Sequence, residues 1–290
     1  MGDVVTDPAV EASGWGSERV DVDAYLRRIG YGGELAVTDE VLRRLHRAHA
    51  GTIPFENLDI VLGRPIDLDI ARLQDKMVRR ARGGYCYEHN LLFAAVLERL
   101  GFTVTRYVGR IRMGSDRVRP RSHMTLRVDV DGRGWLADVG FGGEGLLEPI
   151  TFDDDEPAAQ DSWVYRLHPL GGGVRVLQSR HGDTWFDLYS FAPEPQHLVD
   201  YESYNWYTST HPRSPFTRGM VVQRTGGTVR HTLTRSVLTT VHAGGATDRR
   251  RLDDDEVLDT LGHTFGIVLD AGEIDGLRAA LAASGRPGVR

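Results

Sequence analysis

Cysteine and lysine are almost absent from this sequence: among 290 residues there is one of each, Cys86 and Lys76. A single cysteine excludes any disulfide within the chain, as is usual in a reducing cytoplasm. The sequence also lacks an apolar run near the ~20 residues that a membrane-spanning helix needs, and it shows no signal peptide. The formal net charge of −6 argues against a general nucleic-acid binder. We therefore expect a cytoplasmic protein that binds neither membrane nor nucleic acid, and the arginine bias indicates a bacterial source.

The patterns along the chain predict an α+β protein with four successive regions. Residues 1–19 are small, polar and aperiodic, which predicts a flexible N-terminal tail. Helical periodicity and capping signals dominate 20–101, which we expect to be a helical domain that contains Cys86. Alternating, β-branched segments dominate 102–205 and predict a strand-rich domain. The last region, 206–290, is expected to hold a connecting segment followed by strands and helices.

The individual elements are expected as follows. Helices are expected over 21–29, 38–49, 68–80, 85–100, 253–261 and 274–283. Strands are expected over 103–113, 123–130, 135–139, 163–167, 174–178, 185–189, 220–223, 229–233 and 236–240. Residues 53–58 are expected to form an ordered loop, and the aromatic segment 201–216, which is rich in Ser, Thr and Pro, a connection.

The position of Cys86 suggests a nucleophile. It follows Gly83 and Gly84 closely, lies in the first turn of the expected helix 85–100, and is followed by the apolar stretch Leu91 to Leu100. The unpaired N–H groups and the dipole at a helix N-terminus both favour the thiolate, which is the nucleophilic form of cysteine. A lone cysteine is more often a small buried apolar residue, so the position alone leaves both interpretations open.

A histidine and an aspartate on a predicted hairpin would complete a site. A two-residue turn at 131–132 would place Val130 opposite Arg133. With that register, His123 and Asp138 lie on one face as diagonal neighbours, close enough for an imidazole and a carboxylate to meet. A slip of one residue would put them on opposite faces. The alternative interpretation is an ordinary polar contact across two strands.

Other polar residues are given structural interpretations. His46 and His49 lie three residues apart on a predicted helix, but no third metal ligand is apparent, so we expect both at the surface and no metal site. His89 is a rival base, but its helix directs it along the helix axis and away from a cleft. Arg82 and Glu88 are expected to pair and to brace the loop around the cysteine.

Five segments together resemble the arylamine N-acetyltransferase family, and they occur in the order found in that family. They are Ile53–Leu58, Arg82–Cys86, His123–Val128, Asp138–Gly142 and Asn205–Phe216. The resemblance implies a helical first domain, a β-barrel second domain and an α/β lid. It also implies a core related to papain-like and transglutaminase cysteine enzymes.

The resemblance further implies an activity in xenobiotic metabolism. This is ping-pong transfer of an acetyl group from acetyl-CoA to arylamines, arylhydrazines or hydrazides. Cys86 would be the acetylated nucleophile, His123 its proton-transfer partner and Asp138 the group that orients the histidine. The partners implied are coenzyme A and a small-molecule amine, with no metal, in a monomer or homodimer.

Pocket residues also follow from the resemblance. Phe55, Phe141 and Phe216 would hold the aromatic ring of the acceptor, although each is as readily explained by core packing. Gly142 and Gly143 would approach the CoA pyrophosphate through backbone N–H groups. Two other functions stay open: an amide synthase that closes macrolactam rings from a carrier-bound acyl chain, and a cysteine hydrolase or non-catalytic binding module on the same core.

Overall fold

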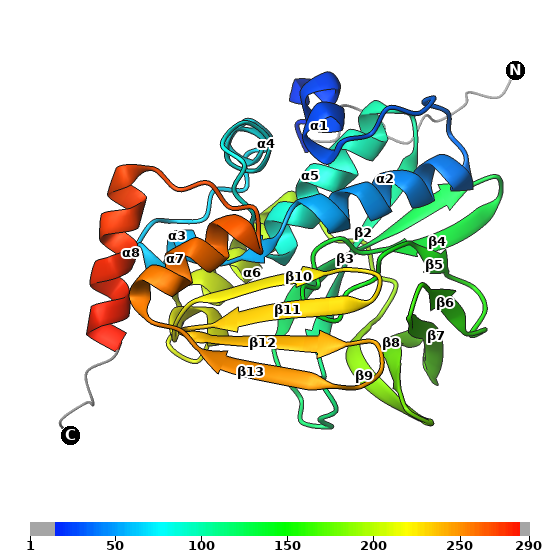
Figure 1. The fold of residues 1–290 in the computed structure, drawn as a ribbon. Coiled ribbons are helices and arrows are strands. Elements are labelled where there is room, and N and C mark those ends of the chain that lie inside the picture. Colours follow the sequence, from blue (N-terminus) through cyan, green and yellow to red (C-terminus); the bar gives the residue numbers. More distant parts are fainter. Residues whose placement is uncertain (1–14, 285–290) are drawn as a thin grey trace, which may run out of the picture.

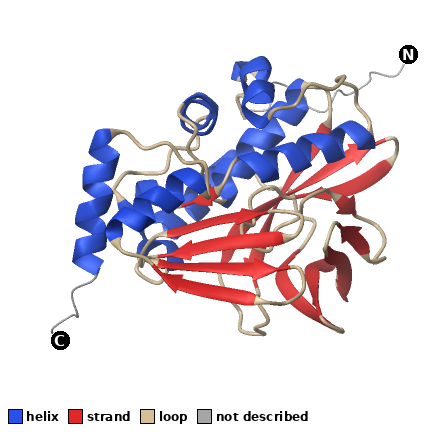
Figure 2. Cartoon of the chain, in the orientation of Figure 1, coloured by secondary structure: helices blue, strands red, loops and turns tan. Residues whose placement is uncertain are grey.

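The computed structural model describes residues 15–284, and it confirms an α+β fold in which most helices lie on one side and two antiparallel sheets on the other (Figure 1, Figure 2). The helices are α1 (Val22–Ile29), α2 (Asp39–Thr52), α3 (Leu58–Val61), α4 (Ile70–Gln74), α5 (Cys86–Arg99), α6 (Leu198–Thr210), α7 (Asp254–His263) and α8 (Ala271–Ser284). A π-helical turn, Asp75–Arg79, continues α4, and 3-10 turns cover Ser17–Arg19 and Pro215–Thr217.

The predicted helix starts are confirmed at α1 and α2. Asp21 Oδ1 accepts the N–H of Ala24 at 2.9 Å, and Thr38 Oγ1 accepts the N–H of Val41 at 3.3 Å. Such side chains satisfy N–H groups that the first turn of a helix leaves unpaired. The helix expected over 68–80 is present as α4 and its π-helical turn.

Helix α5 is buried on every side. All of its residues from Cys86 to Leu97 are buried. A helix of this kind needs neighbours on each face, and α5 has α4 on one side and the strands β2 and β3 on another. The N-terminus of α5 therefore lies between the helical region and the larger sheet.

The larger sheet has eight strands in the order β5-β4-β3-β2-β9-β8-β7-β6. It is strongly curved, since β5 at one edge also contacts β7 near the other. The strands are β2 (Thr103–Ile111), β3 (Arg121–Val130), β4 (Arg133–Ala137), β5 (Ile150–Thr151), β6 (Ala158–Gln160), β7 (Trp163–Gly171), β8 (Val174–His181) and β9 (Thr184–Phe191).

The hairpin of β3 and β4 has the predicted register. Val130 lies opposite Arg133, and the ladder continues to the pair Leu126 and Ala137. The turn residues 131 and 132 both have positive φ, at 51° and 73°. Positive φ at both central residues is what a tight hairpin turn needs to match the twist of its strands. The register therefore follows from the Asp-Gly turn.

The smaller sheet has five strands in the order β1-β10-β11-β12-β13. They are β1 (Phe55–Glu56), β10 (Val221–Thr225), β11 (Val229–Thr234), β12 (Val237–His242) and β13 (Thr247–Arg251). The strands expected near β10, β11 and β12 are confirmed. β1 and β13 were not expected, because β1 has only two residues and β13 is an exposed, arginine-rich edge strand without apolar alternation.

The segment predicted as a connection over 201–216 is largely helical, because α6 spans Leu198–Thr210. Asp200 caps its first turn. Tyr201 is fully buried, and its hydroxyl donates to the carbonyl oxygen of Tyr107 at 3.0 Å. Packing of this aromatic side chain on the larger sheet outweighs the modest helix propensity of the segment. The expectation of a connection was therefore wrong for most of its length.

The N-terminal tail expected over 1–19 lies mostly outside the described residues, which begin at Trp15. From there the chain is packed against the body of the protein. The Arg106 guanidinium lies 4.0 Å from the centre of the Trp15 ring, and that ring contacts Tyr201 edge-on at 5.9 Å. Trp15, near the end of the predicted tail, is thus held by cation–π and aromatic contacts.

Three hydrophobic cores support these elements. The largest joins the helical region to β2, β3 and β4, the second lies within the larger sheet, and the third packs α7 and α8 against the smaller sheet. The domain boundaries expected after residues 101 and 205 stay predictions. Between residues 15 and 284, no helix is long and apolar enough to cross a membrane.

We predict that Gly83→Ala destabilises the fold. A Cβ atom at Gly83 would overlap the carbonyl oxygen of Pro54 and come within 2.9 Å of Cγ of Glu56, so the backbone must shift. Crowding of this kind costs about 1–3 kcal/mol. The control is Gly51→Ala near the end of α2, where a Cβ meets nothing within 4 Å.

Chemical denaturation checks the pair of variants. The free energy of unfolding should fall in Gly83→Ala and stay equal or rise by about 0.5–1 kcal/mol in Gly51→Ala, since a helical glycine costs unfolded-state entropy. Equal stability of the two variants would contradict the close packing of this loop.

Candidate active site

Cys86 is the first residue of α5, as predicted, and only 3% of it is exposed. Tyr85, the residue before it, is held by a side chain in the first turn of α5, because Glu88 Oε2 accepts the N–H of Tyr85 at 2.9 Å. The Cys86 thiol lies 3.6 Å from the carbonyl oxygen of Ser122, on the strand that also carries His123. The N-terminus of α5 thus brings the sulfur to the start of β3.

His123 and Asp138 form a buried pair beside this thiol. Nε2 of His123 lies 2.6 Å from Oδ2 of Asp138, and their side chains are 2% and 0% exposed. The imidazole is enclosed by the ring of Tyr189 at 4.5 Å and by the ring of Phe141, perpendicular to it, at 5.2 Å. The register of the hairpin therefore brings together the two residues that the sequence placed on one face.

The protonation of this pair is set by mutual attraction. Burial alone would lower the pKa of His123, but the charge of Asp138 and hydrogen bonds with Asp138 and Cys86 raise it to about 10. Burial likewise opposes the charge of Asp138, yet His123 and a hydrogen bond from Asn90 hold its pKa below the usual value. The pair is therefore an imidazolium and a carboxylate near neutral pH.

Asn90 belongs to the site, although the sequence did not single it out. Its Nδ2 donates to Oδ1 of Asp138 at 2.9 Å and to the carbonyl oxygen of Met124 at 2.7 Å. Its Oδ1 accepts the N–H of Val139 at 3.1 Å. The spacing was a usable signal, because residues four apart on a helix lie on one face, and Asn90 follows Cys86 by four.

His46 also supports Asp138, and the prediction that it lies at the surface was wrong. Nδ1 of His46 donates to the carbonyl oxygen of Leu147 at 3.0 Å, and Nε2 accepts the N–H of Asp138 at 3.1 Å. A carbonyl requires an N–H, so these contacts fix one neutral tautomer. Burial lowers the pKa of His46 to about 4, which agrees with the neutral form.

His49 is buried as well, in a chain of hydrogen bonds that includes His89. Nε2 of His89 donates to the carbonyl oxygen of Pro54 at 3.1 Å, so Nδ1 accepts from Nε2 of His49 at 2.8 Å. Nδ1 of His49 in turn accepts from the Tyr25 hydroxyl at 2.7 Å. Both nitrogens of His89 are occupied, and burial lowers its pKa to about 4, so it is a structural residue.

Sequence spacing contained the signal for these buried histidines. Leu42, Leu45, His46 and His49 follow the i, i+3, i+4, i+7 pattern of the buried face of a helix, and all four are fully buried. Because histidine is a polar residue, a pattern of apolar residues alone does not include His46 and His49. Among residues 15–284, no group of His, Cys, Asp and Glu is arranged to hold a metal ion.

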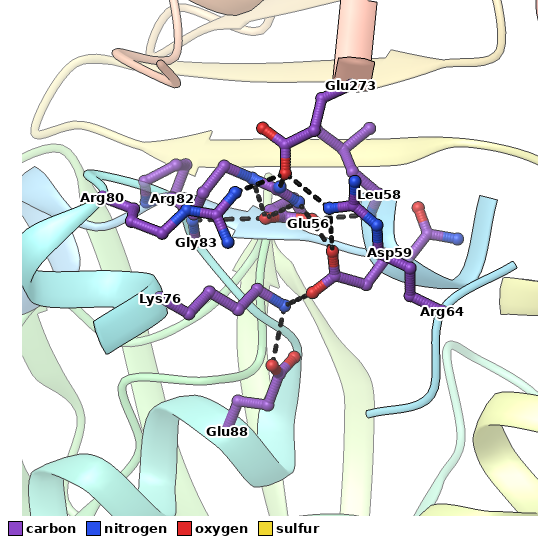
Figure 3. Close-up of polar contacts among 12 residues, drawn as sticks. Glu56, Leu58, Asp59, Arg64, Lys76, Arg80, Arg82, Gly83, Glu88 and Glu273 are labelled. Atoms are coloured by element: carbon purple, nitrogen blue, oxygen red, sulfur yellow. Dashed lines mark hydrogen bonds and ion pairs between the residues drawn. The ribbon is translucent and has the colours of Figure 1, made fainter. Parts of the chain in front are cut away.

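The loop before the cysteine is held by ion pairs, but not by the predicted one between Arg82 and Glu88 (Figure 3). Arg82 donates to Glu56 Oε1 through Nε at 3.0 Å and through Nη2 at 2.8 Å. Glu88 pairs with Lys76 at 2.7 Å. The prediction was wrong because both partners come from other parts of the chain.

A cavity of about 1380 Å³ opens beside the thiol. Cys86 and His123 line it together with Phe55, Phe141 and Phe216, the three aromatic residues expected in a substrate pocket. The rings of Phe55 and Phe216 lie 5.8 Å apart. The cavity therefore has an aromatic wall next to the sulfur and the imidazole.

The two glycines expected to contact CoA are placed differently from each other. Gly143 lines the cavity, but its N–H already donates to Oε1 of Gln223 at 3.1 Å. Gly142 packs behind it against Gln223 and Phe55. The expected free N–H group is thus absent at Gly143, and basic side chains that the sequence did not single out line the cavity instead. They are Arg110, Arg119, Arg180, Arg213 and Arg230.

The chain matches known proteins over most of its length. A family model described as an N-acetyltransferase matches residues 38–274. The arylamine N-acetyltransferase of Mycobacterium tuberculosis is 40% identical over 261 residues, which cover 88% of this chain and 92% of that protein. The arylamine N-acetyltransferase of Escherichia coli is 36% identical over 268 residues, which cover 89% of this chain and 94% of that protein.

Solved structures agree with the sequence matches. The arylamine N-acetyltransferase of Nocardia farcinica superposes with a TM-score of 0.87 at 42% identity and covers 95% of this chain and 99% of its own. The Mycobacterium marinum enzyme, solved in complex with CoA, gives a TM-score of 0.86 at 38% identity over 91% of this chain and 99% of its own. Fold, sequence and family model agree, and the chain belongs to the arylamine N-acetyltransferase family.

Proposed function

We propose that this protein transfers an acetyl group from acetyl-CoA to aromatic amines, arylhydrazines or hydrazides in two half-reactions, through a thioester on Cys86. The observation that carries the proposal is the position of the Cys86 thiol, 3.6 Å from the carbonyl oxygen of Ser122 and on the same cavity wall as His123, whose imidazole is bound to a buried carboxylate. Cys86 and His123 lie on the wall of a cavity large enough for both substrates in turn, and Asp138 lies behind His123. Family membership supports the same reaction class.

In the first half-reaction the Cys86 thiolate attacks the carbonyl carbon of acetyl-CoA. The C–S bond to coenzyme A breaks, and His123 supplies the proton that the departing thiolate takes up. In the second, the amine attacks the thioester, His123 accepts its proton, and the Cys86 thiolate leaves. The thioester keeps the reactivity of acetyl-CoA, so a weakly basic aromatic amine suffices as nucleophile. The backbone N–H of Cys86 is the proposed oxyanion donor.

Asp138 keeps His123 in the tautomer and orientation that both steps need. Because Asp138 contacts Nε2, the opposite nitrogen, Nδ1, is the one directed at the thiol. A carboxylate in this position also stabilises the imidazolium form. Asn90 and His46 restrain the carboxylate and its backbone, so they are positioning residues and do not touch the substrate.

The cavity wall supports the proposed substrates. Phe55, Phe141 and Phe216 offer ring faces and edges to a flat aromatic acceptor. The arginines of the wall attract phosphate groups, which suits the pyrophosphate and ribose phosphate of coenzyme A. Gly143 contributes the close approach of its backbone, since it has no side chain to fill the cavity.

Mass spectrometry tests whether Cys86 is the nucleophile. Incubation with acetyl-CoA and no acceptor should add one acetyl group, and peptide mapping after acid quench should place it on Cys86. An added arylamine should remove it. Cys86→Ala is the matched control and should stay unmodified. Turnover of arylamine with no acetyl group ever found on Cys86 would contradict the two-step route.

The orienting role of Asp138 is tested by Asp138→Asn. The amide keeps the shape but removes the charge and favours the wrong tautomer, so turnover should fall by about 10⁴-fold. Asp129→Asn, on the same hairpin, is the control; Asp129 pairs with Arg127 and its side chain is 37% exposed. Steady-state assays of both variants check the expectation, and equal losses in the two would refute it.

The same pair predicts a pH dependence of stability. The pKa of His123 is about 10 in the folded protein against the ordinary 6.5, so the folded state holds this proton more tightly. The resulting stabilisation is complete below pH 6.5, falls as pH rises and is lost above about 10. Asp138→Asn lacks the charged partner of His123, so its free energy of unfolding should fall less over this pH interval.

Urea denaturation of both proteins across that pH interval measures the difference. The gap in the free energy of unfolding between the original protein and Asp138→Asn should narrow towards the alkaline end. A constant gap would show that the histidine carries no extra proton in the folded state.

A further inference from the structure

A charge-balanced cluster, buried at Arg82, Glu56 and Glu273, lies behind the loop that precedes Cys86 (Figure 3). It combines four carboxylates with four cations from separate parts of the chain. The members are Glu56, Asp59, Glu88 and Glu273, with Arg64, Lys76, Arg80 and Arg82. Its last carboxylate comes from α8, close to the end of the described chain, and the reaction proposed above gives this helix no role.

Glu273 divides its two carboxylate oxygens between two tasks. Oε2 accepts the N–H of Asp270 at 3.1 Å and so caps the first turn of α8. Oε1 accepts hydrogen bonds from Arg64 at 2.7 Å, Arg80 at 2.6 Å and Arg82 at 2.6 Å. The side chain is 0% exposed, and these arginines with the cap hold its pKa below the usual value despite burial. One oxygen therefore joins three guanidinium groups, whose remaining charge is balanced by the other carboxylates of the cluster.

Arg82 transmits this contact towards the nucleophile. Its Nη1 donates a hydrogen bond to Glu273, while Nε and Nη2 donate to Glu56. Glu56 Oε1 also accepts the N–H of Gly83 at 3.3 Å, and the N–H of Glu56 donates to the carbonyl oxygen of Gly84 at 2.7 Å. The backbone from Arg82 to Gly84 is thus fixed by the same carboxylate that shares Arg82 with Glu273.

Loss of the Glu273 charge would leave this cluster with one uncompensated positive charge, and of the three guanidinium groups that Glu273 binds, Arg82 is the buried one. Removing one partner of a buried ion pair destabilises the fold, because the other charge is left unpaired. The arginines must therefore move towards the remaining carboxylates. The nearest of these for Arg82 is Glu56, which holds the loop. A displacement of ~1 Å at the reacting atoms is enough to lower the rate about 10²-fold.

We propose that Glu273 is a positioning residue for Cys86, so that the C-terminal helix α8 sets the geometry of the nucleophile through Arg82. The inference rests on the proposed function, because it assigns to Glu273 a share in the rate of thioester formation. Glu273 does not line the cavity, so its effect falls on the maximal rate and not on the binding of acetyl-CoA.

The test compares Glu273→Gln with Glu256→Gln. Glu256 has the same capping position in α7, where Oε2 accepts the N–H of Asp253 at 2.9 Å, and its other oxygen meets only the largely exposed Arg250. Glutamine preserves a capping box in both helices, so each variant loses a charge and little else. Only the first variant changes the cluster behind the loop.

Three measurements are made on each full-length variant, well below its unfolding temperature. They are the rate of Cys86 acetylation at saturating acetyl-CoA, the concentration of acetyl-CoA that gives half of that rate, and the rate of Cys86 alkylation by iodoacetamide near neutral pH. In Glu273→Gln the maximal acetylation rate should fall about tenfold or more, with little change in half-saturation. Alkylation should slow as well, because misalignment from His123 lowers the thiolate fraction. Glu256→Gln should match the original protein.

Glu273→Asp gives a second, milder variant in case Glu273→Gln does not fold. It keeps the charge, so it should recover most of the acetylation rate. An unchanged maximal rate in a Glu273 variant that only melts earlier would overturn the proposal, as would equal losses in the two glutamine variants. Alkylation needs no acetyl-CoA, so a failure of the proposed acetyl transfer would leave this comparison intact.

Discussion

The guanidinium of Arg82 is the point at which three distant parts of the chain meet. It is 1% exposed and contacts carboxylates from β1, α3 and α8. A buried cation is tolerated only when its partners are in place, because its desolvation must be offset by well-aligned charges. The geometry of the loop before Cys86 therefore depends on carboxylates from the smaller sheet and the C-terminal helix as well as from α3. The loop before Cys86 is thus tied to a residue almost 200 positions later in the sequence, since Glu273 and Arg82 are 191 apart.

Four buried histidines lie on or beside α5, and their different charge states follow from their neighbours. His46, His49 and His89 face carbonyls, amides or one another, and burial lowers the pKa of each. His123 is equally buried, but it faces a carboxylate, and its pKa is raised. Among these four histidines, His123 is therefore the one that holds an extra proton near neutral pH.

The sequence predicted the local features well and the distant ones poorly. The Asp-Gly turn at 131–132 determined the hairpin register, and the cap at Thr38 determined the start of α2, because each depends on neighbouring residues. The pairing of Arg82 was wrong, since no local pattern reveals a partner that comes from another part of the fold. The family motifs indicated Cys86, His123 and Asp138, which come from separate parts of the chain. They did not indicate Asn90 or His46.

Lys76, the one lysine of the chain, is also part of the cluster around Arg82. Its side chain is 11% exposed, and it is paired with Asp59 at 2.6 Å and Glu88 at 2.7 Å, which hold it in the ammonium form. An ammonium is not a nucleophile. The thioester proposed for Cys86 would therefore meet no lysine amine on the surface of this protein or of its own copies.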